Sequence, residues 1–133
     1  MDLVCVDPKE VHKLWPFVSD SLKRAMYRGG LSSFSAMESS VLAGIGLLWV
    51  ACKDKSIFAA AVTELQQTEW RKVCVIVACS GKDMHLWLPL IEGIEKFARA
   101  EGCSAVRIAG RRGWVRVLED YRVKRVVLEK ELD

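Results

Sequence analysis

An uninterrupted apolar run covers residues 73–78, with the sequence VCVIVA. A strand that is covered on both faces has this pattern, which is typical of the centre of an α/β sheet. A polar turn at residues 79–83 follows, and apolar side chains then recur at helical spacing as far as Gly102. The pattern therefore predicts a buried strand, a tight turn and a long helix as the central unit of the chain.

Upstream of this unit, the pattern predicts one short strand and two helices. The strand covers residues 3–6, and a capping pattern opens a first helix that ends at a pair of glycines, within residues 7–30. Pro16 should kink or split this helix, because it removes an N–H group and crowds the preceding turn. A second capping pattern at residues 35–38 predicts a short helix that stops near Gly44.

Two further strands are predicted before the buried one. Residues 47–52 and 57–65 flank a tight polar turn, which is typical of an antiparallel pair, and a second polar turn leads into residues 73–78. The three alanines at residues 59–61 leave room for close packing, more often of a helix than of a ligand. These segments predict a three-stranded antiparallel meander.

The C-terminal third continues the alternation of helices and strands. Residues 105–109 form a predicted strand, parallel to the buried one because a helix connects the two. A short amphipathic helix at residues 114–120 and a final strand at residues 124–132 complete the prediction. The expected fold is one α/β domain over residues 1–133, with a mixed sheet of about six strands and about four helices.

Composition limits the classes of protein that fit this pattern. The chain has 133 residues, 51% of them hydrophobic and 28% charged, which suits one globular domain with a core. A net charge of +3 is too mild to indicate a nucleic-acid-binding protein. The sequence contains neither a membrane-spanning run nor a signal peptide at its acidic start, so we expect a cytoplasmic protein.

Cysteine and histidine give no metal pattern. The five cysteines are odd in number, contain no CxxC pair and mostly sit in apolar runs, so reduced core thiols are expected. His12 has no second histidine at ligand spacing and should be solvated or half-buried. No metal site is predicted.

The turn after the buried strand has features of an anion site. The first N–H groups of the following helix are free to meet an anion such as a phosphate. Gly81 would allow close approach and Lys82 would add positive charge, whereas Asp83 would cap the helix but repel phosphate. An ordinary strand-to-helix turn fits the same residues, so both interpretations stay open.

The order of the elements and two segments carry a resemblance to a known family. Residues 75–102 resemble the acyl-CoA-binding strand, turn and helix of the GNAT acyltransferase superfamily, and residues 114–123 are similar to its A-x-x-x-Y-E-K-x-G-F motif. The resemblance covers nearly the whole chain and implies acetyl-CoA as co-substrate. It implies that pantetheine lies along Val77, Ala78 and Cys79, and that pyrophosphate lies at Ser80, Gly81, Lys82, Asp83 and Met84.

Several positions depart from the family pattern and mark a compact, partly degenerate member. Asp83 and His85 stand where the family has glycines, and Leu118 stands where many members have a proton-donating tyrosine. The resemblance leaves Tyr121, three residues further on, as a substitute donor to the thiolate. Glu64 stands where several members place a general base for the amine, although a carboxylate at a strand end is usually just solvated.

Two functions from different classes follow from these observations. The first is transfer of an acetyl group from acetyl-CoA to an amine on a small molecule or a protein. The second is a catalytically inactive GNAT-like scaffold for binding or assembly, such as a phage-encoded protein packaged in a virion. Residues 104–128 carry seven Lys or Arg and two Asp or Glu, which could meet CoA phosphate, nucleic acid or an acidic partner, or simply be solvated. The five tryptophans exceed what one small core needs, so some are expected to reach the surface at a pocket or at an interface with a partner or a second copy.

Overall fold

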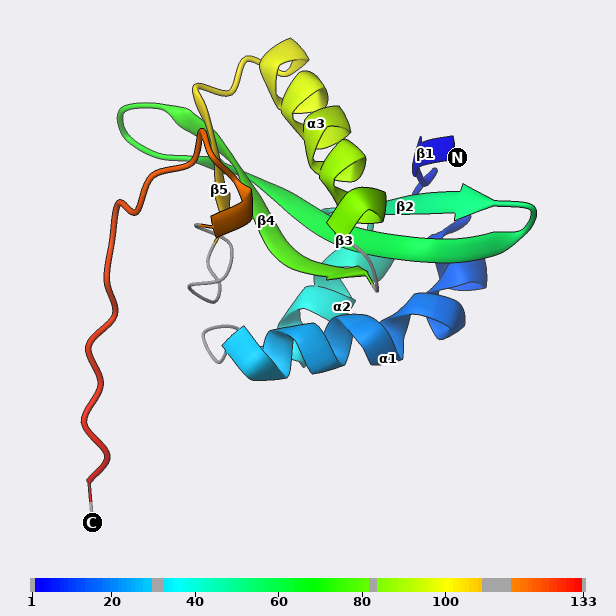
Figure 1. Ribbon diagram of the computed structural model, residues 1–133, viewed down its shortest axis with the longest axis horizontal. Helices are drawn as coiled ribbons and strands as arrows, with labels where there is room; N and C mark the ends of the chain where they lie inside the picture. The colour runs from blue at the N-terminus through cyan, green and yellow to red at the C-terminus, as the bar shows by residue number, and fades with distance from the viewer. Residues whose placement is uncertain (1, 30–32, 82–83, 109–115, 133) are drawn as a thin grey trace.

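A single five-stranded mixed sheet organises the protein, as Figure 1 shows for the computed structural model, which describes residues 2–29, 33–81, 84–108 and 116–132. The strands follow chain order across the sheet: β1 (Asp2–Cys5), β2 (Leu47–Lys53), β3 (Ser56–Gln67), β4 (Lys72–Gly81) and β5 (Ala105–Ile108). Neighbours are antiparallel from β1 to β4, and β4 pairs with β5 in parallel. The predicted meander and the predicted parallel pair are confirmed.

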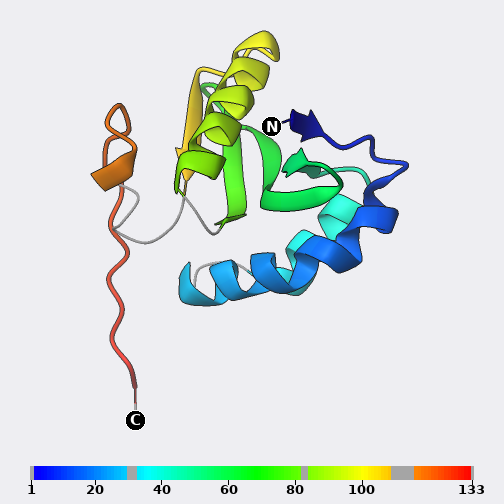
Figure 2. The ribbon, with the colours of Figure 1, turned by 45° about the vertical axis from the view of Figure 1, so that its right-hand side comes forward.

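Within the described residues, three helices cover the two faces of this sheet. α1 (Val11–Gly29) and α2 (Phe34–Leu42) pack on one face, and α3 (Met84–Ala100) packs on the other (Figures 1 and 2). Each face therefore has its own apolar core, and we call the two faces the α1 face and the α3 face. The predicted α/β class is confirmed.

The α1 face is built by one stripe of α1. Its buried side chains recur at helical spacing: Val11, Trp15, Val18, Leu22 and Met26. Pro16 lies inside this helix, which runs unbroken from Val11 to Gly29, so of the two predicted effects of Pro16, a kink or a split, the split does not occur. Pro16 has no N–H group to donate to the His12 carbonyl oxygen, four residues earlier. Both residues are on the exposed side of the helix, where water can bond this carbonyl oxygen instead.

The start of α2 lies two residues before its predicted position. The N-cap is Ser33, whose hydroxyl accepts a hydrogen bond from the Ala36 N–H at 3.3 Å. Phe34 thereby enters the helix and stacks on Trp15, with 6.3 Å between the ring centroids. Ser33 and Ser35 both fit a capping pattern in the sequence. The contact between Phe34 and Trp15 of α1 is what selects Ser33 as the N-cap.

The α3 face is built by α3 against β2, β3 and β4. Leu90, Ile91, Ile94 and Ala98 form the buried stripe of the helix. The alanines of β3 alternate between the two helical layers, with Ala59 and Ala61 in the α3 core and Ala60 in the α1 core. Close helix packing therefore explains these small residues, as predicted.

The C-terminal segment differs from its prediction. Of the predicted helix at residues 114–120, residues 114 and 115 lie outside the described residues, and residues 116 and 117 are helical. The predicted strand at residues 124–132 is not formed. The described sheet accordingly has five strands instead of about six, and three helices cover it instead of about four. A strand needs a neighbour for its backbone hydrogen bonds, and residues 122–132 are exposed along their whole length.

His12 is exposed, as predicted. All five cysteines are free, but the prediction that they are core residues holds only for Cys74: Cys5 is exposed, and Cys52, Cys79 and Cys103 are half-buried. Within the described ranges, no helix is both long enough and apolar enough to cross a membrane.

Candidate functional site

The C-terminal half of β4 extends beyond its parallel neighbour. The ladder between β4 and β5 ends at the pair Ile76 and Ile108, whereas β4 continues for five residues to Gly81. Among the described residues, β4 is paired there only with β3, along its other edge. The backbone groups that face away from β3 are therefore available to an extended ligand.

A bulge in β4 marks the point where β5 ends. Val62 pairs with Ala78 and Thr63 pairs with Ile76, so Val77 has no partner on β3. The bulge also interrupts the alternation of side chains, because Val77 and Ala78 both pack on the α1 face. Ile76 and Cys79, on either side of them, pack on the α3 face. The local kink thus coincides with the free edge.

The side chains of Cys79 and Ser80, which follow the bulge, are constrained by burial and by a hydrogen bond. The Ser80 hydroxyl lies 3.0 Å from the Ser21 hydroxyl of α1. Ser21 donates its only hydroxyl proton to the Val18 carbonyl oxygen at 3.0 Å, so Ser80 must be the donor to Ser21. Burial raises the pKa of the Cys79 thiol to about 12, so this thiol stays protonated at neutral pH.

The predicted anion-binding turn lies only partly within the described residues. β4 continues through Cys79 and Ser80 to Gly81, so the predicted start of the turn is strand. Lys82 and Asp83 lie outside the described residues, as does the side chain of Met84 at the start of α3. The pyrophosphate contacts therefore stay a prediction, made from the position of the α3 N-terminus just after β4.

Glu64 lies on the α1 face of β3. It pairs with Val75 of β4, one pair before the bulge. Its carboxylate oxygen Oε1 accepts a hydrogen bond from the Ser40 hydroxyl of α2 at 2.6 Å. A Cβ atom on Gly46 would lie 3.1 Å from the Ser40 oxygen and 3.5 Å from Glu64 Cγ, so the glycine leaves room for this pair. Sequence inspection missed Ser40, which is 24 residues away from Glu64.

Tyr121 lies on the opposite face from Glu64. Its hydroxyl donates a 2.6 Å hydrogen bond to Glu95 Oε2 of α3, and its ring packs on the α3 core. Burial is the largest cause that raises the pKa of Tyr121, followed by the hydrogen bond and the charge of Glu95. Tyr121 lies after the helical residues 116 and 117, so it does not share a helix face with Leu118 as predicted. Its backbone N–H donates a hydrogen bond to the Leu118 carbonyl oxygen. Leu118 is itself buried in the α3 core.

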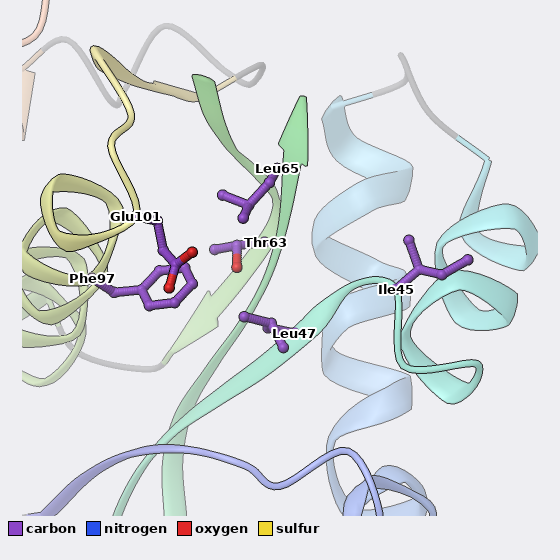
Figure 3. A pocket seen from close by; sticks show the side chains of 6 residues that line it. All are labelled: Ile45, Leu47, Thr63, Leu65, Phe97 and Glu101. Carbon is purple, nitrogen blue, oxygen red and sulfur yellow. The ribbon is translucent and has the colours of Figure 1, made fainter. Parts of the chain in front are cut away.

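A shallow pocket of about 320 Å³ also opens on the protein surface. Its lining comes from the segment before β2, from β2 and β3, from α3 and from the turn that follows α3: Ile45, Leu47, Thr63, Leu65, Phe97 and Glu101. Figure 3 shows Phe97 of α3 and Glu101 just after it pointing toward Thr63. The Thr63 hydroxyl accepts from the Trp49 indole N–H at 3.0 Å, which fixes this wall. The pocket is mostly apolar and lies near the end of α3, away from Gly81.

No group that could hold a metal ion is found among the described residues. The polar chemistry of the candidate site consists of the free β4 edge, the N-terminus of α3 and the Glu64 carboxylate.

Comparison with known proteins defines the class of fold. No protein-family model and no curated protein matches the sequence. The chain has a mixed α/β fold that is similar to those of solved acetyltransferases. An aminoglycoside acetyltransferase from an uncultured soil metagenomic sample is 14% identical with a TM-score of 0.73, over 99% of this chain and 97% of that chain. A predicted acetyltransferase with acetyl-CoA from Clostridium acetobutylicum is 11% identical with a TM-score of 0.67, over 99% and 95%.

A eukaryotic structure gives the same result. An acetyltransferase from Trypanosoma brucei is 15% identical with a TM-score of 0.62, over 98% of this chain and 99% of that chain. At these identities the similarity defines the fold, and the activity has to be argued from the site.

Proposed function

We propose that the protein is an N-acyltransferase that moves the acetyl group of acetyl-CoA to an amine. The observation that carries this proposal is the free edge of β4, which begins at the Val77 bulge and leads to the N-terminus of α3. The similarity of the fold to solved acetyltransferases supports it.

The free edge suits the chemistry of acetyl-CoA. Its pantetheine arm is an extended chain with two amide groups, which can pair with a strand edge as a peptide does. Val77, Ala78 and Cys79 would hold this arm, and Ser80 and Gly81 would lead it to the helix N-terminus. There, free N–H groups and the helix dipole favour a pyrophosphate. When bound, acetyl-CoA supplies an activated acetyl thioester.

The bulge offers a donor for the developing negative charge. Val77 has no partner residue on β3, and its backbone N–H is the proposed donor to the ligand. A fixed N–H group directed at the thioester carbonyl oxygen stabilises the oxyanion that forms when the amine attacks. This role requires no side chain, which suits the apolar residues at this point of β4.

Glu64 is the proposed base for the amine. The amine nitrogen forms a bond to the acetyl carbon, the carbon–sulfur bond breaks, and the sulfur leaves as a thiolate. One amine proton must be removed, and the Glu64 carboxylate, oriented by Ser40, is the acceptor on the α1 face. The thiolate takes up a proton, for which Tyr121 is the predicted donor. However, the Tyr121 proton is already donated to Glu95.

The neutral state of Cys79 favours direct transfer to the amine. An acyl-cysteine intermediate would need a thiolate, and burial disfavours the thiolate form of Cys79. The acceptor in this proposal is an amine of a small molecule or of a protein.

Binding of acetyl-CoA tests the proposal. A ligand that binds the folded state raises its stability by about 2.7 kcal/mol at 100 times Kd, so millimolar acetyl-CoA should raise Tm. Gly81→Glu adds a bulky negative side chain at the end of the free edge and should abolish the shift. Gln66→Glu adds the same charge at an exposed position near the other end of β3 and should keep it. No shift with the wild type would refute the acetyltransferase proposal and favour the non-catalytic scaffold.

A further inference from the structure

The last eleven described residues, 122–132, form an exposed tail. The chain is anchored just before them by the hydrogen bond from Tyr121 to Glu95. Beyond this point the tail extends away from the domain in both views (Figures 1 and 2). At its centre lie three consecutive apolar side chains, Val126, Val127 and Leu128, which are 72%, 62% and 91% exposed. A lone run of this kind is stabilised only when another surface covers it.

The outer edge of β5 offers a matching surface. In the described part of the chain, β5 is the last strand of the sheet and pairs only with β4. Val106 and Ile108 pack against the edge of the α3 core and are only half-buried. An unpaired strand edge is a template for another strand, which supplies both backbone hydrogen bonds and apolar cover.

The apolar pattern selects one antiparallel register between the tail and β5. In a strand, Val126 and Leu128 point to one face, as Val106 and Ile108 do on β5. Pairing Val126 with Ile108 sets Leu128 opposite Val106, so apolar side chains meet on the α3 face. Other antiparallel registers can also set Val126, Val127 or Leu128 opposite Val106 or Ile108. In each of them, a charged residue of the tail lies opposite the second of these two β5 residues.

The charged residues do not distinguish this register. Arg107 points to the face opposite Val106 and Ile108 and lies across from Val127. Its two diagonal neighbours on that face are Glu129, which has the opposite charge, and Arg125, which has the same charge. The choice of register therefore rests on the apolar residues.

We propose that the tail of one copy pairs as an antiparallel strand with β5 of a second copy, in a reciprocal exchange that forms a two-fold dimer. The end of the tail lies far from its own β5 in both views, so the edge that it meets belongs to another molecule (Figures 1 and 2). Reciprocal exchange covers both tails and both edges at once and closes the assembly. This inference does not depend on the proposed enzymatic activity.

The molecular mass in solution tests the dimer. By light scattering after size-exclusion chromatography, the wild type should be a dimer, and Val126→Asp combined with Leu128→Asp should be a monomer. Leu132→Asp changes an equally exposed apolar residue beyond the paired register and should remain dimeric. Because residues 122–132 are exposed and have no strand partner among the described residues, both variants should keep the wild-type circular dichroism spectrum. A monomeric wild type, or a dimeric double variant, would overturn the proposal.

Crosslinking tests the strand pairing itself. Arg107→Cys and Val127→Cys would place thiols directly opposite each other, within reach of a disulfide. A mixture of the two single variants should give a disulfide-linked dimer under mild oxidation, whereas each variant alone should not. A chain that carries both substitutions should also link to its partner. Formation of an intrachain disulfide in that double variant, or no link in the mixture, would contradict exchange between two copies.

Discussion

At the residue scale, the hydrogen bond between Ser40 and Glu64 is the most specific feature of the proposed chemistry. Glu64 is half-buried on the α1 face, one strand away from the bulge, and Ser40 fixes one of its oxygens at 2.6 Å. A general base contributes typically 10²–10⁴-fold to a rate. Glu64→Gln should therefore lower kcat by about 10²-fold and leave the Kd for acetyl-CoA nearly unchanged.

An exposed carboxylate provides the matched control for this prediction. Glu69 lies in the polar turn after β3, and Glu69→Gln makes the same chemical change there, so kcat should be unchanged. A Glu64→Gln variant with wild-type turnover would remove Glu64 from the mechanism. A variant that no longer binds acetyl-CoA would show that Glu64 acts on binding instead.

Tyr121 has a different position and calls for a different test. Its hydroxyl proton is donated to Glu95, and its raised pKa makes it a weaker acid. Tyr121→Phe should therefore lower the free energy of unfolding by roughly 1–2 kcal/mol, with turnover changed only a few-fold. A 10²-fold loss of turnover without loss of stability would instead support its predicted role as proton donor.

The pH dependence of stability gives a second readout for Tyr121. A tyrosine in the unfolded chain has a pKa of about 10, and the folded value is raised. The stability from this shift is complete below about pH 10 and decreases as the pH rises further. In chemical denaturation, Tyr121→Phe should lose this decrease above pH 10.

At the element scale, the sequence predicts the strands and helices whose partners are close along the chain. The unbroken apolar run of β4 and the stripe of α3 identify the central unit directly. The bulge is invisible in the sequence, because it depends on the register between Val77 and β3, and an apolar residue fits either register. The contacts of Ser40 and Ser80 join residues far apart in the chain, so no local pattern reveals them.

In the C-terminal segment, the sequence predicts a strand that the single chain does not form. Its residues have a strand-like composition, but composition does not supply a neighbouring strand. Residues 124–132 therefore stay unpaired in the single chain. If the tail pairs with a second copy, the sequence prediction of a strand applies to the dimer and not to the isolated chain.

At the scale of the whole molecule, the sheet separates two environments. Glu64 and the bulged residues Val77 and Ala78 face α1 and α2, whereas Tyr121 and Cys79 face α3. The free edge of β4 lies between these layers and connects the bulge to the start of α3. A ligand along this edge would contact the backbone first, so its binding would depend little on side-chain identity. This is consistent with a fold that is shared with solved acetyltransferases at only 11–15% identity.

The most direct test of this account is amide hydrogen exchange with and without acetyl-CoA. If the ligand lies along the free edge, millimolar acetyl-CoA should slow exchange within residues 77–81 and at the start of α3. Residues 56–67 of β3 and the tail should exchange at unchanged rates, apart from the general slowing that any bound ligand produces by stabilising the fold. Unchanged exchange within residues 77–81 under acetyl-CoA concentrations that protect another surface would contradict the central claim.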